Sequence, residues 1–582
     1  MSPLELLKSR FAEALADMVE SPSDYLDLIR VNQNPKFGDY QANLAMPLSK
    51  KLGKNPRETA QRIIEKLRWD DLLEQPEIAG PGFINLRFKT EALVRDTLAN
   101  LADGRLGVST VSDPKTFVLD YSAPNVAKPM HVGHIRSTMI GNSLDKILRF
   151  AGHRVISDNH IGDWGTQFGM IIYGWRHFLD KDAYEKNPVE ELARLYRLVR
   201  QKADADPDMM TDVLAETSKL HHGDEENRAL WRSFLPNCRT EIDRVYGRLG
   251  VAFDQTLGES FYNDRLGPLV EDLKKRGLAK ESQGAICLFL DGEEVPMLIQ
   301  KKDGAYLYAT TDLATLAYRK EAFQPDAILY VVDFRQSLHF RQLFKAAKLI
   351  GLDDTDLVHV KFGTVLGEDN KPFKTRSGET VGLESLLDEA EKRALAIVTA
   401  NDRDGALSDD ERRETARVIG IGALVYADLS QNRESDNVFS FDKMLAMNGN
   451  TATYMQYAFA RIRSIFTKGG VDPDDLRRRA AEKNQNGETL LCLDHPAERG
   501  LALSLLKFSD AVHSVLKDYR PNLLTAYLYD LAGDYSTFFE NCPVLKAEEE
   551  SVKTSRLLLC DMTARTIQLG LRLLGIGTVE KM

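Results

Sequence analysis

The chain of 582 residues has only five cysteines, which are widely spaced and include no C-x-x-C pair. This spacing argues against a disulfide scaffold and against a thiolate zinc site, so no protein-bound metal is expected. No stretch approaches the roughly 18 apolar residues that a membrane span needs, and the N-terminus lacks a basic start followed by an apolar run. We therefore expect a cytoplasmic protein without a membrane partner.

The sequence also lacks an excess of basic residues. Its 76 Lys and Arg stand against 87 Asp and Glu, which gives a formal net charge of −11. Over the whole chain this balance argues against nucleic acid, because phosphate groups are usually neutralised by a basic surface. The acidic excess lies between residues 111 and 450, however, and the two ends carry basic runs such as SKKLGKNPR and RIRSIFTK. An RNA partner would therefore be bound by the ends.

The pattern of apolar residues divides the chain into regions of different character. Helical spacing followed by an alternating strand predicts a small α+β unit over residues 1–108. The strand TFVLDYS, a Pro-broken loop, a long helix and the strand HRVISDNHI then form a unit typical of a parallel sheet. This pattern resumes after about residue 300 with DAILYVVDF and LVHVKFGTVL. The interval from about 165 to 300 is predicted to be a mostly helical insertion, and 451–582 an all-α helical bundle.

Two common nucleotide-binding signatures are missing at the first strand-to-helix turn. Neither G-x-G-x-x-G nor G-x-x-x-x-G-K-[ST] follows the strand, which excludes dehydrogenase and P-loop sites of the usual kind. Instead His131-Val132-Gly133-His134 stands directly before the helix. A helix N-terminus offers free N–H groups and positive partial charge, and two imidazole donors beside it suit a nucleoside triphosphate. Pre-placed donors would stabilise charge on an α-phosphate during adenylyl transfer.

Simpler explanations of this tetrapeptide remain open at this point. A zinc pair is disfavoured because helical zinc sites space His four apart with a Glu between them. Two unrelated structural histidines are a stronger alternative for so short a motif. Its place after a strand and before a helix favours the nucleotide site.

The residues around this motif resemble a known family. The run DYSAPNVAKPMHVGHIRST at 120–138 is similar to the "HIGH" signature region of class I aminoacyl-tRNA synthetases, in the form found in the arginyl-tRNA synthetase family. Further blocks are similar to that family: FGDYQ at 37–41, YLYATTDLA at 306–314, DFRQSLHFRQ at 333–342, FKTRSGETV at 373–381, TYMQYAFARIRSI at 453–465 and LAGDYSTFFENCPVL at 531–545. Together these blocks span nearly the whole chain.

The resemblance implies an architecture and an activity. It implies an α/β fold with an appended N-terminal tRNA-binding domain at 1–108, a Rossmann-like catalytic domain at 109–450 and a helical anticodon-binding domain at 451–582. The catalytic domain would carry the insertion and a stem-contact region at about 385–450. The implied activity is that of an arginine–tRNA ligase. ATP with Mg²⁺ would activate L-arginine to arginyl-adenylate, and the acyl group would pass to the 3′-terminal ribose of tRNA(Arg), with tRNA needed for the first step and a monomer as the working state.

The same resemblance assigns candidate residues to ATP and catalysis. The residues implied are Lys128, His131, Gly133 and His134 of the signature region, with Lys374, Thr375, Arg376 and Ser377 of a second loop. Class I synthetases usually carry K-M-S-K-S in that second loop, but here it reads K-T-R-S-G without the second lysine. In this family a lysine ahead of the histidines is thought to compensate, which makes Lys128 a sharper candidate than an ordinary exposed lysine.

Arginine would be recognised by carboxylates and a tyrosine. A guanidinium prefers planar carboxylate partners, and Tyr308 and Asp312 lie four apart, so a helix there would place them on one face. By resemblance, these two hold the guanidinium, while Asp120, Asn125 and Gln342, with His131, contact the amino end or orient the site. Taken alone, Asp312 could be a helix cap and Asp120 a strand-end turn.

Two further groups of residues are candidates for tRNA binding. Tyr454, Tyr457 and Arg461 share one helix face, where two aromatic rings and a cation suit unstacked anticodon bases, although such a stripe is often core. By resemblance, the surface of Phe37, Tyr40 and Gln41 contacts the D-loop side of tRNA, although a tight turn with buried aromatics would also explain them.

Two other functions compete with this hypothesis. Nucleotidylyltransferases also use H-x-G-H on a parallel sheet, but they are usually far smaller and lack a helical RNA-binding tail. A catalytically silent synthetase-like tRNA-binding protein is the main alternative. Such a protein would not need the intact histidines, Lys128 or Asp312.

Overall fold

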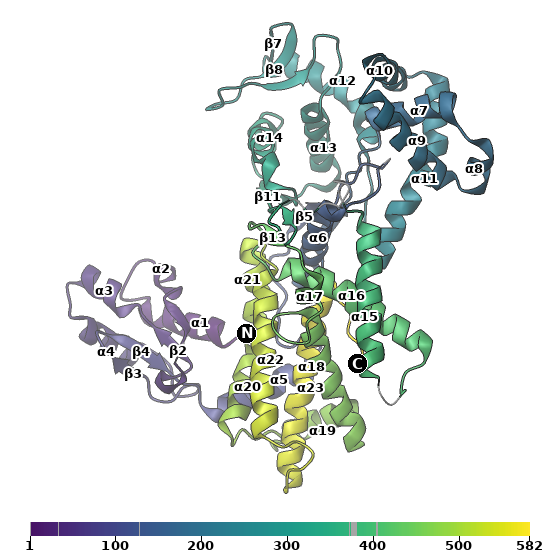
Figure 1. The fold of residues 1–582 in the computed structure, drawn as a ribbon. Coiled ribbons are helices and arrows are strands. Elements are labelled where there is room, and N and C mark those ends of the chain that lie inside the picture. Colours follow the sequence, from purple (N-terminus) through teal and green to yellow (C-terminus); the bar gives the residue numbers. More distant parts are fainter. Residues whose placement is uncertain (1, 33, 127, 372, 374–380, 403–404) are drawn as a thin grey trace. The chain divides into compact units, whose positions relative to one another are not determined.

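The computed structural model describes residues 2–32, 34–126, 128–371, 373, 381–402 and 405–582. These residues form two compact units, whose elements are labelled in Figure 1. One unit consists of residues 111–446 and 573–576, and the other of residues 1–110, 447–572 and 577–582. Among the described residues, no helix combines the length and apolar character needed to cross a bilayer.

A four-stranded parallel sheet lies at the centre of the first unit. Its strands follow the order β11-β10-β5-β6, and every neighbouring pair is parallel. Their bounds are β5 Thr116–Asp120, β6 Arg154–Asp158, β10 Ala327–Tyr330 and β11 Asp356–His359. Parallel neighbours need a crossover, which α6 (Val132–Phe150) supplies between β5 and β6. The predicted strand–loop–helix–strand unit and its resumption after residue 300 are therefore confirmed.

The register of this sheet brings the carboxyl ends of three strands, each with a polar residue, to one edge. Asp120 at the end of β5 pairs with Asp158 of β6 on one side and with Tyr330 of β10 on the other. In open parallel sheets, ligands bind at the carboxyl ends of the strands. We therefore expect a ligand-binding site at the loops that follow Asp120.

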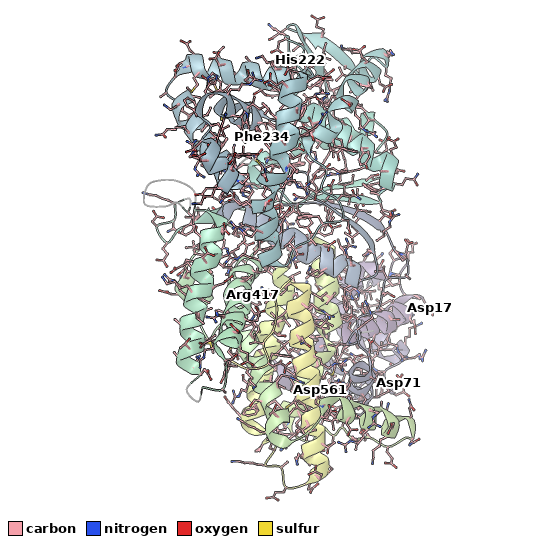
Figure 2. The ribbon with its side chains drawn as sticks, turned by 90° about the vertical axis from the view of Figure 1, so that its right-hand side faces the viewer. Asp17, Asp71, His222, Phe234, Arg417 and Asp561 are labelled. Atoms are coloured by element: carbon pink, nitrogen blue, oxygen red, sulfur yellow. The ribbon has the colours of Figure 1, made fainter. Side chains whose placement is uncertain are left out.

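The insertion between the two halves of the sheet is mostly helical, as predicted. It contains α7 Thr166–Phe178, α8 Lys181–Lys186, α9 Pro188–Ala203, α10 Pro207–His221, α11 Glu225–Leu249 and α12 Glu259–Lys275, followed by the antiparallel strands β7 Ala279–Ser282, β8 Ala285–Leu288 and β9 Met297–Gln300. Phe234 of α11, labelled in Figure 2, is fully buried and lies 4.9 Å from the ring of Trp175 in α7. The insertion thus has an apolar core of its own.

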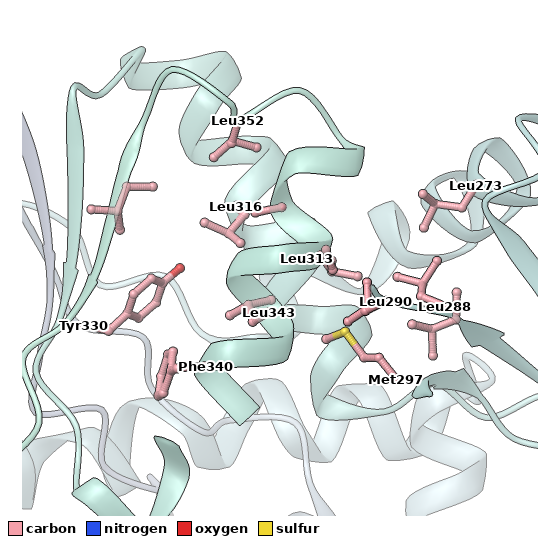
Figure 3. Packing of buried hydrophobic residues seen from close by; sticks show 14 of the residues in the cluster. Leu273, Leu288, Leu290, Met297, Leu313, Leu316, Tyr330, Phe340, Leu343 and Leu352 are labelled. Atoms are coloured by element: carbon pink, nitrogen blue, oxygen red, sulfur yellow. The ribbon is translucent and has the colours of Figure 1, made fainter. Parts of the chain in front are cut away.

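Two helices after the insertion pack on the sheet and against the hairpin strands. These are α13 (Tyr308–Phe323) and α14 (Ser337–Leu349). Figure 3 shows Leu313 and Leu316 of α13 beside Leu343 of α14, in a cluster that also includes Ile328 of β10. Full burial of one such side chain contributes about 1.5–3 kcal/mol to the free energy that favours folding. Helix α13 is therefore held firmly by apolar packing.

The rest of this unit follows the sheet. It comprises the 3₁₀ turn η2 Phe334–Gln336, the parallel pair β12 Val365–Leu366 and β13 Asn437–Val438, and the helices α15 Leu383–Asn401, α16 Asp409–Leu429 and α17 Phe441–Met444. Helices α15 and α16 pack against each other and against α6. These two helices therefore cover part of α6.

The second unit joins the two ends of the chain. Its N-terminal part contains α1 Pro3–Leu15, α2 Ser23–Leu26, α3 Ala45–Leu52, α4 Pro56–Lys66, α5 Thr90–Ala102, the turn η1 Pro35–Phe37, and the strands β1 Ile29–Val31, β2 Tyr40–Ala42, β3 Glu77–Ala79 and β4 Phe83–Leu86. The strands form an antiparallel sheet in the order β1-β2-β4-β3. The C-terminal part contains α18 Ala452–Gly469, α19 Pro473–Gln485, α20 Pro496–Leu506, α21 Phe508–Asp518, α22 Asn522–Asn541 and α23 Glu550–Leu573. The predicted α+β and all-α regions are both present.

Polar contacts tie the two parts of this unit together. The guanidinium of Arg499 on α20 donates to both carboxylate oxygens of Asp39, over 2.8 and 2.7 Å, and to the carbonyl of Phe88 over 2.9 Å. Arg565 on α23 donates to the carbonyls of Leu101 and Asp103 at the end of α5. The N-terminal part is therefore anchored on the helical bundle by arginines.

Candidate active site and RNA-binding surfaces

A cavity of about 400 Å³ opens at the carboxyl end of β5. Its walls come from the loop after β5, the start of α6, and the chain segments that follow β10 and β11. The residues of the signature region that line it include Asp120, His131, Gly133 and His134. The sequence-predicted triphosphate site therefore coincides with a real cavity at the expected edge of the sheet.

The two signature histidines cap helix α6. His131 is the N-cap residue, and its Nδ1 accepts a hydrogen bond from the backbone N–H of Gly133 over 3.1 Å. The Nδ1 of His134 in turn accepts from the backbone N–H of His131 over 3.0 Å, and the two ring centroids lie 4.0 Å apart. Because each Nδ1 is an acceptor, the proton of each neutral ring lies on Nε2. Both rings therefore keep one N–H donor for a ligand.

The electrostatic environment keeps these rings neutral. Burial lowers the pKa of His134 to about 3, with further lowering by His131 and Lys128. Burial, followed by the charge of Lys128, also lowers the pKa of His131. At neutral pH the two side chains are thus uncharged hydrogen-bond donors, and the positive charge near them comes from the helix N-terminus and from Lys128.

Gly133 is required by the fold of this cap. A Cβ at this position would lie 2.9 Å from Cε1 and 3.0 Å from Nδ1 of His131. Any other residue would therefore push the His131 ring away from the backbone N–H that orients it. The small residue in H-x-G-H is explained by the histidine itself.

The loop after β5 holds an unusual backbone beside the cavity. Ser122 and Ala123 both have positive φ, at 73° and 46°. Such conformations are uncommon for residues other than glycine, and they persist only when surrounding contacts enforce them. Here the N–H of Ser122 donates to Ser137 Oγ over 2.8 Å, and the N–H of Ala123 donates to Asn159 Oδ1 over 3.1 Å. The site is thus built before any ligand arrives.

Lys128 lies on the surface near the histidines. Its ammonium is 6.0 Å from the ring centroid of Tyr196 on α9, and its charge contributes to the lowered pKa of both His131 and His134. Burial and the nearby Arg200 lower the pKa of Lys128 itself. Asn125 is also exposed. Its side-chain oxygen lies close to Gly162, only 2.3 Å from the position that a Cβ of that residue would take.

The second loop falls outside the described residues. Lys374, Thr375, Arg376 and Ser377 all belong to this segment. On one side of it, Phe373 lines the cavity, and on the other side the carbonyl of Val381 accepts a hydrogen bond from the N–H of Val132 over 3.0 Å.

Helix α13 presents the residues expected to read the guanidinium. The segment containing Tyr308 and Asp312 is helical, as the four-residue spacing required, so both lie on one face. The Tyr308 side chain is 72% exposed. The carboxylate of Asp312 contacts Nε2 of His339 on α14 over 2.6 Å, and this bond raises the pKa of His339. Asp312 is therefore not a helix cap, which was the simpler alternative.

One acidic residue near this face was missed in the sequence. Burial raises the pKa of Glu259, at the start of α12, to about 7, with Asp163 and Asp312 raising it further and His160 opposing them. Its charge also raises the pKa of Tyr308 after burial has done so. Glu259 thus lies within electrostatic reach of both candidate guanidinium-binding residues. The only signal in the sequence was an acidic residue after a glycine, which is too common to single out.

Two candidates for the amino end of arginine are engaged by the protein itself. Asp120 is buried and accepts a hydrogen bond from Arg319 over 2.6 Å. Gln342 donates its amide to the carbonyl of Val295 over 2.9 Å and does not line the cavity. In this structure Asp120 can orient the site, whereas Gln342 would have to leave Val295 to contact arginine.

The candidate anticodon-binding face lies on α18. Tyr457 is 38% exposed and Arg461 is exposed, while Tyr454 is half-buried. The guanidinium of Arg461 lies 4.2 Å from the ring centroid of Phe539, and Tyr454 pairs edge-on with Tyr529 of α22. A cavity of about 740 Å³ is lined by residues that include Tyr454 and Tyr529. The stripe is thus partly exposed and is not a buried core face.

The N-terminal candidates divide into exposed and buried residues. Phe37 is 52% exposed and Gln41 is half-buried, with its amide 2.9 Å from Asn85 Oδ1. Tyr40 is fully buried against Phe88, with ring centroids 5.9 Å apart. The alternation of strand β2 turns Tyr40 inward, as the alternative of a buried aromatic required, so this side chain supports the surface that carries Phe37 and Gln41.

The described residues contain no group of three or more His, Cys, Asp or Glu side chains placed to hold a metal ion. The cavity at the signature motif is lined by two imidazoles and by the carboxylates of Asp120 and Asp333, but Asp120 already accepts from Arg319 and Asp333 from Arg335. The imidazoles are N–H donors. Such groups suit phosphate oxygens better than they suit Mg²⁺, which prefers oxygen ligands.

Comparison with known proteins gives matches along almost the whole chain. Residues 97–441 match the family model described as tRNA synthetases class I (R), catalytic domain; residues 455–582 match the DALR anticodon binding domain; residues 5–88 match the arginyl tRNA synthetase N terminal domain. A curated relative from Rhodopirellula baltica, named arginine–tRNA ligase, is 45% identical over 99% of both chains. Another of that name, from Nostoc punctiforme, is 46% identical over 99% of both chains.

Solved structures show the same similarity in three dimensions. The arginyl-tRNA synthetase of Plasmodium falciparum superposes with a TM-score of 0.83 at 29% identity, covering 100% of this chain and 99% of the other. That of Thermus thermophilus shares the fold, with a TM-score of 0.81 at 24% identity and full coverage of both chains.

Proposed function

Because this chain belongs to the arginyl-tRNA synthetase family of class I and is an arginine–tRNA ligase, we propose specific roles for its cavity and for helix α13. The cavity at the end of β5 binds ATP, and α13 binds the arginine side chain. The observation that carries this proposal is the pair of neutral histidines that line the cavity at the N-terminus of α6.

In the first step the arginine carboxylate attacks the α-phosphate of ATP and pyrophosphate leaves. The Nε2–H groups of His131 and His134 donate to phosphate oxygens, and the N-terminus of α6 adds favourable potential where negative charge develops. Lys128 neutralises the β- and γ-phosphates and the departing pyrophosphate, in place of the second lysine that the K-T-R-S-G loop lacks. Roles for Lys374, Thr375, Arg376 and Ser377 in the same step rest on the resemblance alone.

Mg²⁺ accompanies the triphosphate in this proposal. The ion would be held mainly by ATP itself, since the described residues around the cavity offer no group of three or more acidic side chains for it. When bound, it neutralises phosphate charge. The protein groups then orient the triphosphate.

The guanidinium of arginine is recognised by an acidic pocket on α13 and α12. Asp312 and Glu259 supply carboxylates, and Tyr308 covers the planar group from the exposed side. Asp120 and Asn125, beside the cavity, orient the amino end toward the α-phosphate. Lysine has a single ammonium without the planar fork and would leave one of these carboxylates unpaired.

In the second step the terminal ribose hydroxyl of tRNA(Arg) attacks the acyl carbon of the adenylate, so that an ester forms and AMP leaves. The half-exposed face of Tyr454, Tyr457 and Arg461 binds anticodon bases by stacking, and the exposed Phe37 contacts tRNA from the N-terminal part. Neither step needs a covalent protein intermediate, because positioning and charge stabilisation provide the acceleration. We further propose that the chain works as a cytoplasmic monomer.

ATP- and tRNA-dependent charging with each of the twenty standard amino acids tests this function. We expect charging of tRNA(Arg) with arginine, dependent on ATP and Mg²⁺, and no charging with lysine. Binding of tRNA without any arginine transfer would instead identify a catalytically silent protein.

A further inference from the structure

Arg319 lies on the same face of α13 as the two residues proposed to bind the guanidinium. It follows Asp312 by seven positions and Tyr308 by eleven, which are whole numbers of helical turns to within about 20°. Its side chain is fully buried. Helix α13 therefore carries substrate-binding groups at its beginning and a buried cation nearer its end.

The guanidinium of Arg319 bridges the carboxyl ends of two sheet strands. Its Nη2 donates to Asp120 Oδ2 on β5 over 2.6 Å and to Asp158 Oδ2 on β6 over 2.7 Å. Asp120 and Asp158 are directly paired in the parallel register and both are buried. Without a cation between them, two such carboxylates could not both remain ionised at low cost.

The two aspartates differ in what else they do. Asp158 has no described contact with the cavity, whereas Asp120 lines it next to the histidine cap. Burial raises the pKa of Asp120, and Arg319 opposes this rise. Arg319 thus helps to keep Asp120 charged and turned in one direction.

The ion pair is not what docks α13 on the sheet. Leu313 and Leu316 already bury α13 in the main apolar cluster of this unit, together with Ile328 of β10. A buried ion pair contributes little net stability relative to apolar side chains of similar volume, because its desolvation cost offsets the attraction. Its geometry, in contrast, fixes direction and distance, because the single nitrogen Nη2 donates to both carboxylates.

We propose that Arg319 is a positioning residue. It fixes the position of Asp120 and of the guanidinium-binding face of α13 relative to the adenylate cavity. Arg319 touches neither substrate. It acts through Asp120 and through the axial position of α13, so that the arginine carboxylate reaches the α-phosphate. This inference rests on the proposed function of the same site.

The first test replaces Arg319 by lysine, which keeps the charge but carries it on a shorter and more flexible side chain, so the ammonium does not reproduce the position of Nη2 between the two carboxylates. In tRNA-dependent ATP–pyrophosphate exchange, we expect Arg319→Lys to raise the KM for arginine about tenfold or more and to lower kcat, while the KM for ATP changes by less than about twofold. The exposed pair Arg265–Glu321, which also holds α13, supplies the control. Arg265→Lys should match the wild type.

The second test separates positioning from stability. Arg319→Met leaves two buried carboxylates without a cation and is expected to lower the melting temperature. The double variant Arg319→Met/Asp158→Asn removes the excess charge. We expect it to recover the melting temperature while the KM for arginine stays raised. Recovery of both together would show a merely structural role and overturn the proposal.

The outcomes also separate this inference from the proposed function. If the wild-type chain charged no arginine, the proposed function would be wrong, and a positioning role of Arg319 in that reaction would be wrong with it. If the wild type charged arginine and Arg319→Lys kept its KM for arginine within about twofold, the inference alone would be wrong.

Discussion

Nε2 of His339 lies 2.6 Å from Oδ2 of Asp312, so the carboxylate proposed to bind the guanidinium of arginine already has a partner from α14. The two side chains are both about a quarter exposed, at 29% and 26%. A protonated histidine in this place competes with the substrate for the same oxygen. The pair therefore links arginine binding to pH.

The first prediction follows from the raised pKa of His339, whose main cause is the hydrogen bond that its Nε2–H donates to Asp312. A histidine with a raised pKa stabilises its ion pair below the ordinary value of about 6.5, and this stabilisation is lost as the pH rises through the folded pKa. The KM for arginine should therefore fall as the pH rises through that window. His339→Gln should flatten the profile, and an unchanged pH dependence in that variant would rule out His339 as the competing group.

The second prediction concerns Glu259, whose pKa is raised to about 7 by burial first of all. Near that pH about half of the carboxyl groups carry a proton, and a bound guanidinium would favour the ionised form. Binding of arginine should therefore release about half a proton near pH 7. Titration calorimetry in buffers of different ionisation enthalpy measures this release. Glu259→Gln should abolish it, and equal release by the variant would assign the proton elsewhere.

The third prediction concerns His134, whose pKa of about 3 keeps it neutral. Its Nε2–H acts as an uncharged donor, so the rate of adenylate formation should not follow a histidine titration at this residue above about pH 5. His134→Ala should lower kcat for ATP–pyrophosphate exchange by about 10²–10³, the usual effect of losing one pre-placed donor. His222, an exposed histidine of the insertion labelled in Figure 2, provides the matched control, since His222→Ala should leave the rate unchanged. A loss below about threefold in His134→Ala would remove it from the donor pair.

The fourth prediction concerns the clamp between Arg499 and Asp39. Asp39 follows Phe37 and Gly38, and Gly38 has φ of 104° with a Cβ position only 2.6 Å from the carbonyl oxygen of Leu86. Arg499 thus fixes the turn that carries Phe37, which we propose to contact tRNA. Arg499→Ala should raise the KM for tRNA about tenfold without changing that for arginine, and it should destabilise its unit by about 3 kcal/mol because a buried charge loses its partner.

The control for this clamp is Arg478, an exposed arginine of α19 with ion pairs to its own helix. Arg478→Ala should leave the KM for tRNA and the KM for arginine near those of the wild type. Equal tRNA KM values for Arg499→Ala and Arg478→Ala would show that the clamp does not position the tRNA surface.

Much of the fold could be predicted because it follows from the spacing of apolar residues within short segments. The alternation and helical spacing around TFVLDYS and HRVISDNHI identified a parallel sheet, and H-x-G-H at a strand-to-helix turn identified its cavity. The four-residue spacing of Tyr308 and Asp312 likewise required only a helix. The structure confirms each of these.

The rest of the site depends on contacts between distant residues. Arg319 reaches Asp120 and Asp158 across 199 and 161 positions, and no periodicity in one sequence can reveal such a pairing. Glu259 likewise acquires its raised pKa only when the insertion folds beside α13. The burial of Tyr40 also depends on distant residues, because Tyr40 and Ala42 turn inward only when the three-residue strand β2 pairs with β1 and β4.

The central claim is that α13 reads the guanidinium of arginine through Asp312. The most direct measurement is the KM for arginine of Asp312→Asn in tRNA-dependent ATP–pyrophosphate exchange, beside Asp303→Asn as an exposed control from the preceding turn. We predict a rise of about 10² or more for Asp312→Asn, because a charge-assisted bidentate partner is lost, with the KM for ATP unchanged. A KM for arginine equal to that of the wild type would contradict the account.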